Sequence, residues 1–295
     1  MILIFYFLLI LLSVAFFTLL ERKFLGFVQI RKGPFKVGLV GMFQPFSDAI
    51  KLFSKSSFFS IKSNHFLSVI SPIYFFFLSL IFFFFKPFFS LSIFSLLVLI
   101  LMFLYSIGIY CTLFTGWASN SKFSLIGSIR SITQSISYEI TLGVIFLYFS
   151  LSYASLNLFF YMNFNVLFFN LLMNFLILSL FMINFLIESN RTPFDLAECE
   201  SELVSGFNVE YGGMEFSLIF LGENLMLIFN SLVITIYMSS IFYISTVWIV
   251  MVMVMILIRG AYPRLRLDFM LKLCWLKFLP FTLIMMQILI FIIYS

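Results

Sequence analysis

The chain has 295 residues, of which 63% are hydrophobic and only 10% are charged, and its formal net charge is +5. Ordinary soluble domains contain roughly a quarter charged residues. This composition excludes a soluble enzyme and indicates an integral membrane protein. Three scattered cysteines and one histidine are too few to hold an iron–sulfur cluster or a bis-histidine haem, so we expect no metal site and no redox centre in this chain.

Apolar runs long enough to cross a bilayer recur along the whole chain, since about 20 residues at 1.5 Å per residue span the hydrocarbon core. The first run has no basic segment before it and no cleavage signal after it, so we interpret it as a retained helix. We predict an all-α polytopic membrane protein, a single transmembrane domain with eight transmembrane helices at about 2–20, 66–85, 88–115, 124–149, 165–187, 216–239, 241–258 and 274–294.

The distribution of basic residues tests this count of helices. With the N-terminus outside, nearly every Lys and Arg that lies in a loop falls on one face, and the opposite face receives only Lys86. Loops on the inner face of a membrane normally contain this excess of positive charge. We therefore expect both termini on the outer side.

The first inside loop contains an amphipathic segment at 42–55. Its apolar residues, among them Phe43, Phe46 and Ile50, recur at helical spacing, while Asp48 and Lys51 occupy the other side. This pattern is typical of a helix that lies in the membrane interface.

Three carboxylates fall inside or at the end of predicted spans: Glu139 in the fourth, Glu188 at the end of the fifth and Glu223 in the sixth. Such groups cost about 2.5–3.5 kcal/mol on insertion scales, so each requires a partner or a polar cavity. The fourth span also contains Gln134 and several serines, a composition that indicates a helix beside hydrated space.

The loop at 188–215 is acidic, and its stretch from Glu188 to Gly213 contains half of the twelve Asp and Glu residues of the chain. Thr192 and Pro193 fit the cap and first position of a short helix that starts there. On that helix Asp195, Glu198 and Glu202 would share one face while Glu200 points elsewhere. So many carboxylates beside Arg191 alone favour coupled titration, as in a proton relay. A solvated acidic face that docks a basic partner is the alternative.

Four stretches of the chain combine charged residues with glycine: ERKFLGFVQIRKGPFKVGLVGMFQPFSDAIKLFSK at 21–55, GWASNSKFSLIGSIRSITQSISYE at 116–139, ESNRTPFDLAECESELVSGFNVEY at 188–211 and RGAYPRLRLD at 259–268. Together they resemble chain 1 of the NADH:ubiquinone oxidoreductase family of respiratory complex I. They occur in this order on the predicted inside face, so the resemblance covers essentially the whole chain.

This resemblance implies a core membrane subunit of the proton-pumping enzyme, which forms a ubiquinone-binding chamber and a carboxylate relay that couples quinone reduction to proton translocation. The residues that match the family at the chamber are Arg22, Arg31, Asp48, Phe220, Arg259 and Arg264. Those that match at the proton relay are Glu139, Glu188, Asp195, Glu198, Glu200, Glu202 and Glu223.

The resemblance also implies the surroundings of the chain. Ubiquinone would be the bound substrate, while NADH, FMN and the Fe-S clusters would belong to partner subunits: an iron–sulfur peripheral arm on the inside face and antiporter-like subunits within the membrane. Membrane lipids would surround the chain, and no nucleic acid is expected. The implied location is the mitochondrial inner membrane with both termini on the intermembrane-space side, or alternatively a bacterial plasma membrane.

Three other functions stay open at this point. The related membrane subunit of a hydrogenase-type complex would share the scaffold and use another electron acceptor. A stand-alone cation or proton transporter would use Glu139 and Glu223 as ion sites. A structural anchor for a peripheral arm would need neither.

Overall fold

The computed structural model describes residues 2–57, 60–85, 96–158, 168–197, 206–238 and 243–294. Within these ranges every regular element is a helix, which confirms the predicted all-α class. The principal helices are α1 (Ile2–Val28), α2 (Gln44–Ser54), α3 (His65–Phe84), α4 (Leu97–Ser119), α5 (Lys122–Ser152), α7 (Phe168–Glu188), α9 (Gly213–Met238), α10 (Ile244–Ala261), α11 (Leu267–Leu273) and α12 (Leu279–Tyr294). Two short 3-10 helices, η1 (Leu39–Gly41) and η2 (Gly206–Asn208), lie in loops, and a π-helical segment, η4 (Cys274–Phe278), joins α11 to α12.

Seven helices of the described part are long and apolar enough to cross a membrane, which makes the chain a multi-pass membrane protein. They are α1, α3, α4, α5, α9, α10 and the continuous helix formed by α11, η4 and α12. The remaining predicted span, the fifth at 165–187, corresponds to α7, which is 21 residues long. The count of eight spans and the side on which the termini lie stay predictions.

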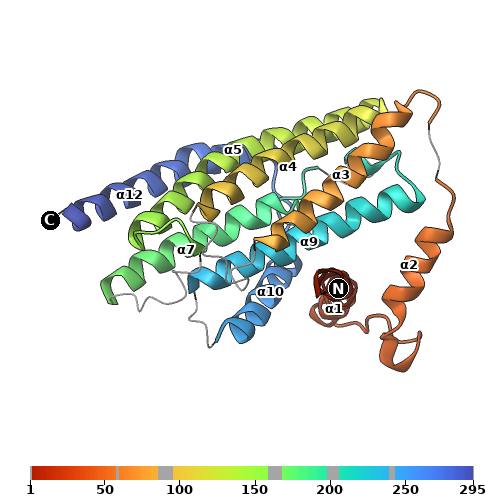
Figure 1. Ribbon diagram of the computed structural model, residues 1–295, viewed down its shortest axis with the longest axis horizontal. Coiled ribbons are helices and arrows are strands. Elements are labelled where there is room, and N and C mark those ends of the chain that lie inside the picture. The colour runs from red at the N-terminus through yellow and green to blue at the C-terminus, as the bar shows by residue number, and fades with distance from the viewer. Residues whose placement is uncertain are drawn as a thin grey trace.

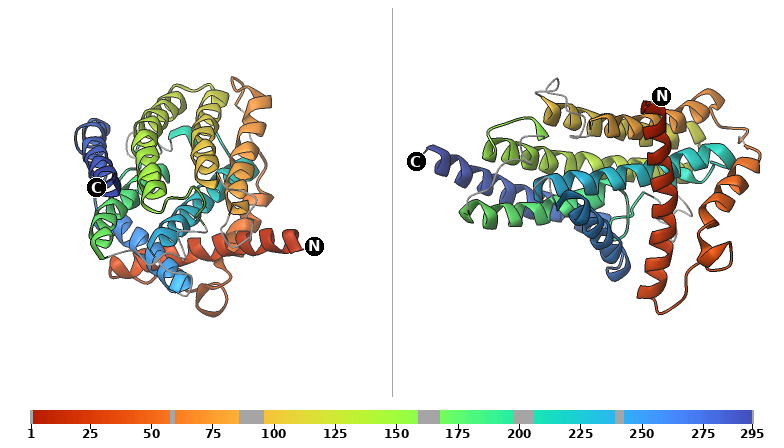
Figure 2. Two further views of the ribbon diagram at one scale, coloured as in Figure 1. Left: turned by 60° about the vertical axis from the view of Figure 1, so that its left-hand side comes forward. Right: turned by 60° about the horizontal axis from the view of Figure 1, so that its bottom comes forward.

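The bundle is arranged around α9. Helices α3, α4, α5, α7, α9 and α12 run along the long axis of the molecule (Figure 1), and α9 contacts α3, α7 and α10. Helix α1 is seen end-on in Figure 1 and runs across the other helices in Figure 2. It packs against α2, α9 and α10. Because α1 crosses the bundle instead of running along it, a space is left between α1 and these helices.

Several helix ends differ from the prediction. Helix α1 continues to Val28, so the charged residues after position 20 belong to the helix. The last helix starts at Leu267 rather than at 274. Helix α4 is described from Leu97 onward, and the first part of the predicted third span, 88–95, lies outside the described residues. The segment predicted as a helix at 42–55 is observed as α2 (Gln44–Ser54), and its place in the membrane interface stays a prediction.

The predicted start of a short helix at Thr192–Pro193 is wrong, because residues 192–197 form turns. Tertiary contacts occupy the backbone groups that a helix would use: Leu265 N donates to Pro193 O at 2.9 Å, and Gln134 Nε2 donates to Phe194 O at 3.0 Å. Glu198, Glu200 and Glu202 lie outside the described residues.

The centre of the bundle is packed with aromatic rings. Phe181 on α7 lies 4.3 Å from Phe185, 5.3 Å from Phe146 and 5.5 Å from Tyr237 between ring centroids, and all four rings are buried. Contacts of this kind give an aromatic pair about 0.5–1.5 kcal/mol beyond the area it buries. They join α5, α7 and α9 into one core.

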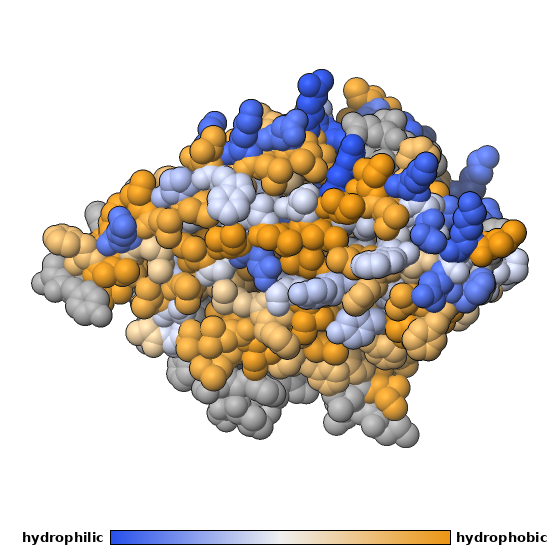
Figure 3. Space-filling view, turned by 90° about the horizontal axis from the view of Figure 1, so that it is seen from above, coloured by the Kyte–Doolittle hydropathy of each residue, from blue (hydrophilic) through white to orange (hydrophobic). Residues whose placement is uncertain are grey.

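The surface is mostly apolar, as expected for a protein that faces lipid. Figure 3 shows hydrophobic residues over most of the visible face, while hydrophilic residues gather along the upper edge and toward the right-hand end. In Figure 1 the same end contains the start of α3, the end of α4 and the start of α5 and α9.

Candidate functional site

A cavity of about 560 Å³ occupies the angle between α1, α2, α9 and α10, and we call it the chamber. Apolar side chains cover much of its wall, including Leu52 and Phe53 from α2 and Phe220 from α9. Its complete lining is Ala15, Thr18, Glu21, Arg22, Leu25, Pro45, Asp48, Ala49, Lys51, Leu52, Phe53, Lys55, Arg191, Phe216, Ser217, Phe220, Leu221 and Arg259. A volume of this size suits a ligand rather than a few waters.

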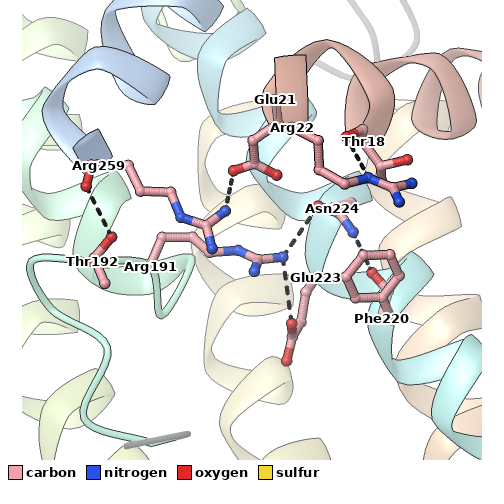
Figure 4. A network of polar contacts seen from close by, with 9 residues as sticks. All are labelled: Thr18, Glu21, Arg22, Arg191, Thr192, Phe220, Glu223, Asn224 and Arg259. Carbon is pink, nitrogen blue, oxygen red and sulfur yellow. Dashed lines mark hydrogen bonds and ion pairs between the residues drawn. The ribbon is translucent and has the colours of Figure 1, made fainter. Parts of the chain in front are cut away.

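The chamber also carries charge, with five basic and two acidic side chains in its lining. Arg22 Nη1 pairs with Asp48 Oδ2 at 2.7 Å, which joins α1 to α2. Arg259 on α10 forms an ion pair with Glu21 on α1 (Figure 4). These two pairs hold the chamber walls together, and the excess of basic groups favours an electron-rich or anionic ligand.

A third ion pair lies deeper. Arg191 Nη2 is 3.6 Å from Glu223 Oε2 and donates a hydrogen bond to Asn224 Oδ1 at 3.1 Å (Figure 4). Both charged side chains are nearly inaccessible, at 8% and 7% exposure. Removing one member of such a pair leaves a buried charge uncompensated, which costs several kcal/mol.

Beyond this pair lies a smaller cavity of about 40 Å³, the inner cavity. Its lining combines Glu188 and Glu223 with Ser131 and Ser135 of α5 and with residues of α3 and α4. Because one water needs about 10–15 Å³ of this measure, the inner cavity has room for a few waters with polar partners. Arg191 lines the chamber and its partner Glu223 lines the inner cavity, so the ion pair lies between them.

The segment that carries Arg191 is fixed by long-range hydrogen bonds. Gln134 Nε2 on α5 donates to Ile187 O at 2.8 Å and to Phe194 O at 3.0 Å, on either side of Arg191. The Thr192 hydroxyl donates to Arg259 O at 3.3 Å, and Arg264 pairs with Asp195 at 2.8 Å. Arg191 is therefore positioned by α5 and by the end of α10.

The loop before α9 is attached to the bundle in a similar way. Tyr211 donates its hydroxyl to Thr115 O at 3.0 Å, and burial raises the pKa of this phenol, so it keeps its proton. A Cβ on Gly127 would come within 2.8 Å of Phe207 N, so glycine at this position lets η2 pack directly on α5. Within the described residues, no group of three or more His, Cys, Asp or Glu side chains is placed to hold a metal ion.

The family model described as NADH dehydrogenase matches residues 1–290 of the chain. The chain belongs to the NADH dehydrogenase family. Its relatives include proteins named "NADH-ubiquinone oxidoreductase chain 1". That of Aedes aegypti is 41% identical over 282 residues, which is 93% of this chain and 89% of the relative. That of Apis mellifera ligustica is 42% identical over 96% and 93% of the two chains, and that of Rhipicephalus sanguineus is 44% identical over 98% and 94%.

The chamber contains four of the six side chains that the resemblance to the NADH dehydrogenase family assigns to quinone: Arg22, Asp48, Phe220 and Arg259. The other two do not line it. Arg31 is exposed in the loop after α1, and Arg264 pairs with Asp195.

The described carboxylates of the predicted relay fall into two groups. Glu188 and Glu223 line the inner cavity together, and Glu139 on α5 interacts electrostatically with Glu188. Asp195 lies apart from them in its ion pair with Arg264.

Four charged groups of the chamber were not among the predicted site residues: Glu21, Lys51, Lys55 and Arg191. Glu21 is 7% exposed, and it falls just after the predicted first span at 2–20, so the prediction places it outside the membrane helices. An acidic residue that follows an apolar run without a helix stop is the signal that could have revealed it.

Proposed function

We propose that this chain is a membrane subunit of NADH:ubiquinone oxidoreductase, with eight transmembrane helices in the mitochondrial inner membrane and both termini on the intermembrane-space side. Its partners are an iron–sulfur arm on the inside face and antiporter-like membrane subunits, with lipid around the apolar surface. NADH, FMN and Fe-S clusters belong to those partners. The family and its relatives support the subunit assignment.

In this proposal the chamber binds ubiquinone. The ligand has an apolar isoprenoid tail and a ring with two carbonyl oxygens, and the chamber offers apolar walls together with arginine donors. Phe220 and Phe216, stacked at 6.4 Å between centroids on α9, would contact the tail or the ring. Arg22 and Arg259 would donate to the oxygens. Arg31 and Arg264 would act near the entrance rather than at the ring.

The observation that carries the coupling proposal is the Arg191–Glu223 pair between the two cavities. Reduction of ubiquinone to ubiquinol takes up two electrons, supplied by a partner subunit, and two protons. Negative charge on the quinone in a desolvated chamber attracts Arg191. A buried carboxylate that loses its cation is stabilised when it binds a proton, so Glu223 takes one from the inner cavity.

Glu188 and Glu139 then continue the relay away from the chamber. Glu188 passes a proton to Glu223 through waters of the inner cavity and is then reprotonated. Because Glu188 interacts electrostatically with Glu139, each change in the charge of Glu188 is felt by Glu139 on α5. Asp195, Glu198, Glu200 and Glu202 on the acidic loop would supply protons from the inside face. No electron passes through a centre in this chain.

The relay is tested by Glu223→Gln in the intact complex reconstituted in liposomes, with quinone reduction and protons pumped per electron measured together. We expect a lower pumping ratio. Glu215→Gln is the matched control, because Glu215 lies on the same helix but lines neither the chamber nor the inner cavity. A Glu223→Gln complex that pumps at the normal ratio would exclude Glu223 from the relay.

A further inference from the structure

Two asparagine amides are buried in the helix bundle without a full set of partners. Asn184 on α7 is 1% exposed, and within the described residues neither its Oδ1 nor its Nδ2 has a hydrogen-bond partner. Asn230 on α9 is 0% exposed; its Oδ1 accepts a hydrogen bond from the Tyr105 hydroxyl at 2.7 Å, but its Nδ2 has no such partner. Each unpaired buried group costs about 1–3 kcal/mol, so both amides call for a ligand.

Water suits such a position because it both donates and accepts hydrogen bonds. It can therefore pair with the oxygen or with the nitrogen of an amide, whichever way the amide is turned.

The two amides lie at the same depth of the bundle, just beyond the inner cavity. On α7, Asn184 stands one turn from Glu188 and one turn from Phe181 on the same face. Glu188 lines the inner cavity together with Met226 of α9, whereas Phe181 contacts Tyr237 of α9 at 5.5 Å. Asn184 therefore lies at the same depth in the bundle as the part of α9 between residues 226 and 237, and that part contains Asn230.

We propose that Asn184 and Asn230 bind ordered water at this level, and that this water extends the inner cavity into the apolar core of the bundle. A buried water usually makes about three hydrogen bonds. The Asn184 amide offers a donor and an acceptor, Asn230 Nδ2 offers a donor, and the remaining lone pair of the Tyr105 oxygen offers an acceptor.

The water site would extend the proposed relay from Glu188 farther away from the chamber. Water beside Asn184 places a proton-conducting group one turn past Glu188, on the side of the bundle away from the chamber. The aromatic cluster around Phe181 and Tyr237 closes the path one turn further on. This functional part rests on the proposed relay, whereas the water site itself does not.

The water site is tested by a cryo-electron microscopy map of the intact complex that resolves waters inside this subunit. We expect density within hydrogen-bonding distance of the Asn184 amide and of Asn230 Nδ2. Waters resolved beside Glu188 and Glu223, with no density beside a well-ordered Asn184, would overturn the proposal.

The functional role is tested by Asn184→Leu, which keeps the volume and removes both polar atoms. We expect loss of the water density and a lower ratio of protons pumped to electrons transferred. Asn184→Ser keeps a hydroxyl that can hold water and should keep the ratio, which also covers the case in which the leucine variant does not assemble. The matched control is Asn174→Leu on the same helix, whose buried amide is already paired with Tyr148 at 3.2 Å; it should leave the ratio unchanged.

The failure of this inference differs from failure of the relay. If the Glu223→Gln complex pumps normally, the proposed relay is wrong. The presence or absence of water density beside Asn184 in the cryo-electron microscopy map then still decides whether the water site exists. If Glu223→Gln lowers the ratio while Asn184→Leu removes the water and leaves the ratio unchanged, the relay ends at Glu188 and the conducting role of the water is wrong.

Discussion

The two halves of α9 lie in opposite surroundings. Its first part, through Asn224, borders the chamber and the inner cavity and carries Phe216, Phe220 and Glu223. Its second part, from Leu225 to Tyr237, is buried throughout, and of its residues only Met226 lines the inner cavity. One helix thus has two roles: its second half packs in the core of the bundle, and its first half lines cavities whose walls are joined by ion pairs.

These halves should respond differently to mutation. In lipid the packing of side chains, rather than their removal from water, drives helix association, so lost contacts in the aromatic core should weaken the fold. Around the chamber, lost charges should change ligand binding and proton transfer more than stability.

The largest effect on stability is expected for Phe181→Ala. The ring is fully buried between Phe146, Phe149, Phe185 and Tyr237, and a large-to-small change at such a site costs about 3–5 kcal/mol. Denaturation of the complex in detergent measures this cost. Phe103→Ala is the control, since Phe103 is 63% exposed; equal losses in both variants would contradict a packed aromatic core.

An intermediate effect is expected for Gln134→Leu. This change removes two hydrogen bonds to Ile187 O and Phe194 O. Both carbonyls keep a backbone donor, Asn190 N at 3.1 Å and Leu196 N at 2.9 Å, so each lost hydrogen bond should cost about 0.5–1.5 kcal/mol. Because Gln134 positions the segment that carries Arg191, quinone reduction should also slow. Thr133→Ala, at the exposed neighbouring position, should change neither property. Normal stability and turnover in Gln134→Leu would show that the segment is held by other contacts.

The smallest effect on stability is expected for Arg22→Gln. Arg22 and Asp48 are 44% and 37% exposed, and such surface pairs contribute about 0–1 kcal/mol. The KM for a soluble ubiquinone analogue should nevertheless rise severalfold, because Arg22 lines the chamber. Lys23→Gln is the neighbouring control, since the Lys23 ammonium donates to Val40 O outside the lining. An unchanged KM in Arg22→Gln would remove Arg22 from the quinone site.

The helices were predictable from the sequence because the signals for them are local. Apolar runs of spanning length gave α3, α5, α9 and α10 within a few residues, and the amphipathic period of 42–55 gave α2. Predictions failed where tertiary contacts decide the outcome. Residues 192–197 have the local signs of a helix start, but Gln134 and Leu265 bind their carbonyl groups.

The site was predictable only in part for the same reason. Single costly charges such as Glu188 and Glu223 can be recognised in a span, and the resemblance supplied Arg22 and Asp48. The pairing of these charges depends on how distant helices meet. Glu21 and Arg259 are 238 residues apart in sequence, and no local pattern indicates that they form the chamber wall together.

The central claim is that the Arg191–Glu223 pair couples the chamber to the inner cavity. A double-mutant cycle with Arg191→Gln, Glu223→Gln and the combined variant tests it most directly, with protons pumped per electron as the readout at matched assembly. The account predicts that the double variant loses no more pumping than the worse single variant, with an interaction energy in the range of about 0.5–3 kcal/mol found for residues in contact. Independent, additive losses in the two single variants would contradict it.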